Sequence, residues 1–222
     1  MLSFLVQPYL VTVAGYPIPT FAVALDAALA IGLIVALRLA AARGVPTLRA
    51  LDVALWVLPA ALVGARSWYV VRHWPEYAAH PPAILALWEG GLSLTGAVAA
   101  GALAIAAVAR AVRWTGWQLA DGAAIGAALG QAIGRLGCVP AGCAAGRAAT
   151  ELPAWLPALS LPDASGLVAP RFPSQLAESL ADGLLALALW RLWRARWPAG
   201  RVALAYLAGY CLIRAAAQPF RA

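Results

Sequence analysis

Charged residues are scarce in this chain, and lysine is absent altogether. Only 11% of the 222 residues are charged, whereas 64% are hydrophobic. Soluble domains are roughly half apolar and about a quarter charged, so this composition favours an integral membrane protein. All 16 basic residues are arginine, a whole-chain bias that points to codon composition more than to a binding surface. The net charge of +7 therefore predicts no nucleic-acid partner.

Cysteine is also rare, and three cysteines are too few for a disulfide-rich scaffold. The chain begins with "MLSFLVQPYLVTVAGYPIP". This start has neither the basic segment nor the small-residue cleavage pattern of a secretory signal. We therefore expect it to belong to the mature protein.

Six segments are apolar enough to form membrane spans, each of which needs about 20 such residues. They are Thr20 to Ala41, Leu51 to Val71, Leu92 to Val112, Gln118 to Cys138, Gln175 to Leu192 and Val202 to Pro219. The sequence thus predicts an all-α integral membrane protein with six transmembrane helices, built as a single polytopic domain over residues 1–222.

Arginines gather in alternate connections between these segments. The connections carry Arg43 and Arg49, then Arg110 and Arg113, then the run from Arg191 to Arg201. Because basic loops stay in the cytoplasm, the termini, the loop from Arg72 to Gly91 and the loop of about residues 139–174 are expected outside. That loop is rich in proline and small residues, which predicts a short outer head or lid without long regular elements.

Polar residues interrupt the spans near the predicted outer surface. In the fourth span, Gly122, Gly126, Gly130 and Gly134 recur every four residues, a small-residue stripe that lets a neighbouring helix approach closely. Arg135 follows this stripe directly, one turn from Gln131 and Cys138. The other polar positions are Arg66 after Gly64, the set Gln175, Glu178 and Asp182, and the set Tyr206, Tyr210, Arg214 and Gln218.

Two explanations fit these buried charges. Glu178 or Asp182 could neutralise Arg135 or Arg214 as structural ion pairs, because buried charges must be paired. Alternatively, the arginines could bind the phosphate of a lipid headgroup, which a guanidinium recognises through its planar fork of donors. Arginines on three helices exceed the need of a single ion pair, which favours an outward-open phospholipid cavity.

Several motifs together resemble the prolipoprotein diacylglyceryl transferase family. They are "GARSWYVV" from Gly64, "GGLSLTGA" from Gly90, "GRLGCVPAGCAAGR" from Gly134, "PSQLAES" from Pro173 and "YCLIRAAAQPFR" from Tyr210. The resemblance implies a multi-pass protein of the bacterial cytoplasmic (inner) membrane with its active cavity toward the outer side. It further implies a transferase that moves a diacylglyceryl group from phosphatidylglycerol to the cysteine thiol of a lipoprotein precursor, or to a related acceptor.

The resemblance also implies roles for individual residues, and no cofactor or metal. The expected catalytic residues are Arg135, Arg214, Tyr210, Glu178 and Thr95. The expected substrate-binding residues are Arg66, Gln175, Arg147, Gly134, Gly137 and Gln218. Thr95 replaces the family's histidine and cannot act as a base near neutral pH as an imidazole can. Activation of the thiol would then come from another base such as Glu178, or the acceptor would already be ionised.

Cys138 and Cys143 replace an asparagine and a glutamate of the family signature, and four interpretations stay open. The two cysteines could form a disulfide on the oxidising outer side or pack as small apolar residues. They could also supply a reactive or lipid-accepting thiol, or bind zinc together with His73 and His80. Two alternative functions accompany these interpretations: a non-catalytic phospholipid-binding or accessory protein, and a thiol-redox membrane protein that uses Cys138 and Cys143.

Overall fold

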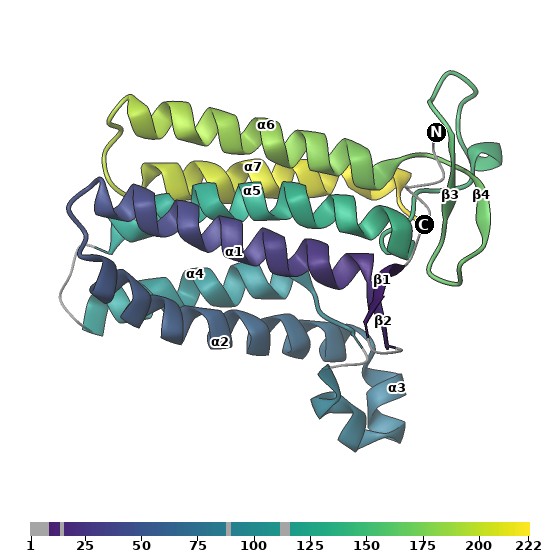
Figure 1. Cartoon of the computed structure of the whole chain (residues 1–222), viewed down its shortest axis with the longest axis horizontal. Coiled ribbons are helices and arrows are strands. Elements are labelled where there is room, and N and C mark those ends of the chain that lie inside the picture. Colours follow the sequence, from purple (N-terminus) through teal and green to yellow (C-terminus); the bar gives the residue numbers. More distant parts are fainter. Residues whose placement is uncertain (1–8, 14–15, 88–89, 112–115) are drawn as a thin grey trace. The chain divides into compact units, whose positions relative to one another are not determined.

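The computed structural model describes residues 9–13, 16–87, 90–111 and 116–222, and it is predominantly helical (Figure 1). The chain divides into two compact units. The first unit comprises residues 1–38 and 121–222, and the second comprises residues 39–120. Each unit is described below by itself.

The first unit is built on four long helices. They are α1 (Thr20–Ala41), α5 (Trp117–Ala141), α6 (Ser174–Arg194) and α7 (Arg201–Ala217), of which α1 and α5 run a few residues into the other unit. Short elements complete it: β1 (Tyr9–Val13), β2 (Tyr16–Pro19), η4 (Ala149–Glu151), β3 (Leu159–Pro162), β4 (Val168–Arg171) and η5 (Gln218–Phe220). The second unit contains α2 (Thr47–Arg72), α3 (Trp74–Ala79), η2 (Pro81–Leu85) and α4 (Leu94–Ala111).

All six predicted apolar segments form helices, and α1 has the predicted bounds. Three of the described helices, α1, α2 and α5, are both long and apolar enough to cross a membrane. The apolar part of α4, Leu94–Val108, is shorter. Val112, the predicted end of the third span, and Arg113 lie outside the described residues. The structure thus shows a helical protein with membrane-capable helices.

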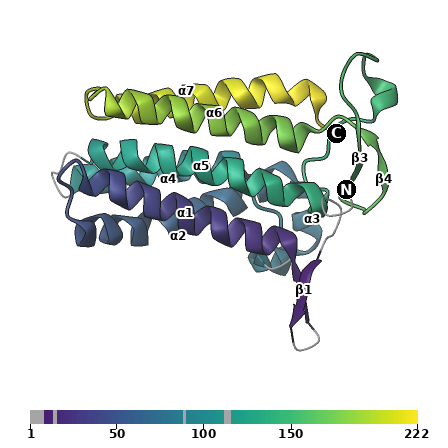
Figure 2. The ribbon, with the colours of Figure 1, turned by 45° about the horizontal axis from the view of Figure 1, so that its top comes forward.

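Helix α5 runs beside α1 in Figures 1 and 2, and the glycine stripe of α5 packs against α1. A Cβ on Gly126 would overlap the carbonyl oxygen of Gly32, and a Cβ on Gly32 would overlap that of Gly126. Further along, Gly130 faces the carbonyl of Ala28, and Gly137 packs against Ala24. The predicted close approach of a neighbouring helix is therefore confirmed, and it holds the end of α5 that carries Arg135.

A buried carboxylate fixes the start of α7 onto α5. Asp121 is 3% exposed, and its two oxygens accept hydrogen bonds from the backbone N–H groups of Gly200 at 3.0 Å and Ala203 at 2.9 Å. The first N–H groups of a helix have no partner within the helix, so Asp121 satisfies donors that burial would otherwise leave unpaired. It acts as an N-terminal cap supplied by another helix.

The predicted outer loop contains a small antiparallel hairpin, in which β3 pairs with β4. Asp163 organises its turn, because its Oδ1 atom accepts hydrogen bonds from the N–H of Ser165 and of Leu167. Its Oδ2 atom forms an ion pair with Arg171 at 2.6 Å. A second hairpin, β1–β2, precedes α1. The composition of the loop correctly predicted that it has no long helix or strand. The sequence did not predict either of the two hairpins.

Candidate functional site

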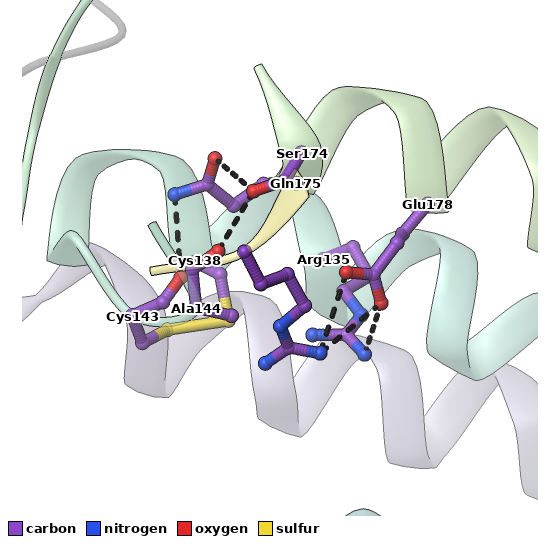
Figure 3. Close-up of a disulfide and its surroundings, with 8 residues drawn as sticks. Arg135, Cys138, Cys143, Ala144, Ser174, Gln175 and Glu178 are labelled. Carbon is purple, nitrogen blue, oxygen red and sulfur yellow. Dashed lines mark hydrogen bonds and ion pairs between the residues drawn. A yellow bond between two sulfur atoms is a disulfide. The ribbon is translucent and has the colours of Figure 1, made fainter. Parts of the chain in front are cut away.

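Glu178 is the centre of a buried charge cluster in the first unit. Its side chain is 3% exposed, and its Oε2 atom lies 2.6 Å from Nη2 of Arg135 (Figure 3). Two further arginines approach the same carboxylate, with Nη1 of Arg214 at 3.5 Å from Oε2 and Nη1 of Arg221 at 3.3 Å from Oε1. Helices α5, α6 and α7 and the C-terminal segment each contribute one residue. We call these four residues, Arg135, Glu178, Arg214 and Arg221, the arginine cluster.

The arginine cluster carries more positive than negative charge. Asp182, one helical turn beyond Glu178 on α6, is the other buried carboxylate of this helix and is 3% exposed. Among the residues that the structure describes, three guanidinium groups thus stand against two buried carboxylates, so the group as a whole keeps a net positive charge. The structural ion pairs predicted from the sequence are present, since Glu178 pairs with Arg135 and Arg214. They do not neutralise all of the positive charge of the three arginines. A bound anionic group would neutralise the remaining positive charge of the arginine cluster.

Two tyrosines and a glutamine pack beside this cluster. Gln131, on α5, donates a hydrogen bond to the hydroxyl of Tyr206 at 2.6 Å. The ring of Tyr206 stacks on that of Tyr210, with centroids 6.1 Å apart, and both rings are 5% exposed. The four-residue spacing of the polar stripe on α7 therefore brings Tyr206, Tyr210 and Arg214 to the inner face of the unit. The catalytic role expected for Tyr210 stays a prediction.

Cys138 and Cys143 are joined by a disulfide, one of the four alternatives that the sequence left open. Figure 3 shows it beside the start of α6. The hydroxyl of Ser174 donates to the carbonyl of Ala144 at 2.8 Å, and the amide of Gln175 donates to that of Cys143 at 3.3 Å. Gln175 is fully buried. Its observed contacts hold the loop after α5, and the substrate contact expected for it stays a prediction.

The same loop also holds the last residues of the chain. The N–H of Arg147 donates to the carbonyl of Phe220, and the N–H of Ala222 donates to that of Ala145, each at 3.0 Å. Between them Gly146 forms a bridge with Arg221. These contacts place Arg221 at Glu178. Sequence reasoning missed Arg221, although it stands in the same C-terminal motif as Arg214, because it lies beyond the end of α7.

The remaining expected site residues of the first unit lie around this centre. The side chain of Arg147 is 48% exposed and pairs with Glu151 at 3.6 Å. Gln218 is exposed at the start of η5. Gly134 and Gly137 belong to the face of α5 that meets α1, where a Cβ on Gly134 would stand 3.9 Å from Ala28. These contacts explain the glycines by helix packing, and substrate binding by these four residues stays a prediction.

Arg66 belongs to the second unit and binds backbone carbonyls. Its guanidinium donates to the carbonyl oxygens of Ala83, Ile84, Ala86, Gly90 and Gly91, at 2.6 to 3.3 Å. A guanidinium has five N–H groups, so these bonds occupy all of them. In this conformation Arg66 fastens the segment between α3 and α4 to α2. Its expected role in substrate binding stays a prediction.

The motif "GGLSLTGA" meets α2 in the same unit. Gly96 packs against the backbone of Gly64, where a Cβ on Gly64 would lie 2.8 Å from the carbonyl oxygen of Gly96. Thr95 is exposed in the first turn of α4. The two motifs that resembled the family in this half of the chain therefore contact each other. The catalytic role expected for Thr95 stays a prediction.

Within the described part of the chain, no group of three His, Cys, Asp or Glu side chains is arranged to hold a metal ion. The disulfide also uses both sulfur atoms that the zinc interpretation needed. With Cys138 and Cys143 oxidised, neither residue presents a thiolate for metal binding or nucleophilic attack.

Comparison with known proteins finds a family match over most of the sequence and similarity to individual relatives over about half of it. The profile of the prolipoprotein diacylglyceryl transferase family matches residues 8–222. A phosphatidylglycerol–prolipoprotein diacylglyceryl transferase of Trichormus variabilis is 36% identical over 114 residues, covering 51% of this chain and 40% of that protein. The enzyme of the same name from Symbiobacterium thermophilum is 34% identical over 122 residues, covering 54% and 45%. The matched segment is thus less than half the length of either relative.

Proposed function

Because the chain belongs to the prolipoprotein diacylglyceryl transferase family, we propose that it transfers a diacylglyceryl group from phosphatidylglycerol to the cysteine thiol of a lipoprotein precursor. The sulfur would bond to the terminal glyceryl carbon of the donor, and the carbon–oxygen bond to phosphate would break. Glycerol phosphate would leave with the bonding electrons. The names of the relatives include both the donor and the acceptor.

The arginine cluster is the observation that carries this proposal. Arg135, Arg214 and Arg221 surround Glu178, and the described residues around them leave a net positive charge. The phosphate of the donor would supply that anion, and the arginines would stabilise the charge that grows on the leaving glycerol phosphate. Oriented charges of this kind usually contribute most to catalysis. Glu178 would hold the three cations at the spacing that the phosphate needs.

The thiol must also lose a proton. Both oxygens of Glu178 are engaged in ion pairs with arginines. We therefore assign the role of the base that accepts the thiol proton to Asp182 and not to Glu178. Asp182 is 3% exposed, and its Oδ1 atom has no hydrogen-bond partner among the described residues. The proton would pass from the acceptor sulfur to this oxygen as the new carbon–sulfur bond forms.

We further propose six membrane spans in the bacterial inner membrane, with the cluster toward the outer side. Two features of the first unit support this orientation. The exposed arginines Arg191 and Arg194, at the end of α6 far from Glu178, and Arg196, just after it, lie where the positive-inside rule expects the cytoplasm. The disulfide lies beside the cluster, and disulfides persist in oxidising compartments.

The test uses purified protein in detergent with phosphatidylglycerol and a lipobox peptide. Release of glycerol phosphate and a diacylglyceryl increase in peptide mass are expected. Arg135→Ala and Arg214→Ala should each abolish both signals, whereas Arg201→Ala, an exposed arginine at the other end of α7, should not. Phospholipid binding without release of glycerol phosphate would contradict the transferase and favour a lipid-binding protein.

A further inference from the structure

A cleft of about 230 Å³ lies between α6 and α7, which run side by side in Figures 1 and 2. Small side chains create it: Ala177 and Ala181 on α6 stand four residues apart, and Ala216 and Ala217 line it from α7. Phe172 and Phe220, whose rings pack 5.1 Å apart, also line the cleft. Most of its wall is therefore hydrocarbon.

One wall residue of this cleft is Glu178. The residue whose carboxylate holds Arg135, Arg214 and Arg221 therefore also borders the apolar space. An apolar cleft beside surplus positive charge matches an amphiphile whose hydrocarbon chain begins close to an anionic group. A phospholipid with a net negative headgroup has this form, whereas a zwitterionic one carries a cation that the arginines would repel.

We propose that this cleft holds part of one acyl chain of the phosphatidylglycerol donor while its phosphate binds the arginine cluster, an inference that rests on the proposed function. Sites for whole drug-sized ligands measure about 300 to 1,000 Å³. A volume of about 230 Å³ therefore suits a segment of one chain rather than a complete phospholipid. Ala177 and Ala216 are exposed, so the chain can enter between the helices from the surrounding bilayer.

The test is photo-crosslinking of the protein in phosphatidylcholine nanodiscs. The probe is phosphatidylglycerol with a diazirine in one acyl chain, and mass spectrometry locates the labelled residues. We expect label on residues 213–220, at the end of α7 and in η5, and on the facing residues of α6. A matched phosphatidylcholine probe should label these residues several-fold less. Equal labelling by both probes would show a general lipid contact and overturn the proposal.

Two neighbouring alanines of α7 provide matched variants. Ala216→Leu fills the cleft and should reduce labelling there several-fold. Ala215→Leu adds the same bulk at an exposed position that does not line the cleft, and it should leave labelling unchanged. An equal effect of the two variants would overturn the proposal. Because both positions are exposed, neither substitution buries a larger side chain in the packed interior.

Turnover of the lipobox peptide in the same nanodiscs separates this inference from the proposed function. Turnover with no label in the cleft would overturn the acyl-chain site and leave the transferase intact. Label in the cleft that Ala216→Leu removes, without any turnover, would support the lipid site and contradict only the transferase.

Discussion

The carboxylate of Glu178 lies 2.6 Å from the guanidinium of Arg135, and both side chains are largely buried. Removing one partner of a buried ion pair typically costs about 3 to 5 kcal/mol, because it leaves an uncompensated charge. Here Glu178 also faces Arg214 and Arg221, so its loss would leave three cations close together. The pair is therefore expected to contribute to the stability of the unit.

Glu178→Gln should lower the free energy of unfolding by about 3 kcal/mol and abolish transfer, since the amide keeps the shape but not the charge. Thermal unfolding in detergent and turnover measure the two effects. Glu151→Gln is the matched control, because it removes the carboxylate of an exposed pair with Arg147, and such pairs contribute about 0 to 1 kcal/mol. Equal stability of the two variants would contradict the structural role of Glu178.

Loss of the disulfide should weaken the loop that places Arg221. The two cysteines are five residues apart, and closing so short a loop contributes about 2 kcal/mol by chain entropy. The double variant Cys138→Ser with Cys143→Ser should therefore melt at a lower temperature than the wild type. A reductant should lower the wild-type melting temperature to that of the variant.

Cys211 is free and exposed, so Cys211→Ser is the control and should melt as the wild type does, with the same response to reductant. Turnover discriminates the thiol-redox alternative, which needs Cys138 and Cys143 to cycle. If the double variant transfers lipid after correction for its lower stability, these thiols have no chemical part in the reaction.

Asp182→Asn tests the route proposed for the thiol proton. The variant should lose turnover near neutral pH, where an ordinary thiol with a pKa of about 8.5 is mostly protonated. Turnover should recover as pH rises past that value, because the acceptor then ionises without a base. The readout is the pH profile of turnover with a lipobox peptide. A uniform loss at every pH would contradict the role of Asp182 as proton acceptor.

The helices were predictable from the sequence because their signal is local. A long apolar run such as Thr20–Ala41 specifies a helix by length and composition, and the glycine stripe ending at Gly134 correctly predicted a close helix neighbour. Contacts between residues that lie far apart in the sequence were not predictable in this way. Nothing near Arg66 in sequence indicates that its guanidinium binds the carbonyls of Gly90 and Gly91.

The arginine cluster was predictable in part, for the same physical reason. Arg135, Glu178 and Arg214 stand out because charges inside apolar helices are costly and need partners. Arg221 follows the last long helix, where an arginine is ordinary, and only the loop contacts of Gly146 bring it to Glu178. Position in the fold, not residue type, gives Arg221 its place in the site.

The turn of the outer hairpin should depend on pH through Asp163. The hydrogen bond from the Ser165 hydroxyl, with those from the backbone and the charge of Arg171, lowers the pKa of Asp163 below its ordinary value. A carboxyl with a lowered pKa in the folded state stabilises that state above its unfolded pKa, about 3.9, and the contribution is lost as pH falls through the folded pKa. The hairpin is therefore expected to be intact at neutral pH and to loosen only in acid below about pH 4.

Ser165→Ala removes the largest cause of this shift, the hydroxyl donor to Oδ1 of Asp163. The pKa of Asp163 should move back toward the ordinary value, although the N–H of Leu167 and the charge of Arg171 still lower it. The carboxyl carbon chemical shift of Asp163, followed by NMR between pH 6 and pH 2 in wild type and variant, measures both midpoints. Ser160→Ala on β3 alters an exposed hydroxyl of the same hairpin and should leave the midpoint unchanged. If Ser165→Ala also leaves it unchanged, the hydroxyl does not hold the carboxylate in solution, and the turn rests on its backbone hydrogen bonds and Arg171.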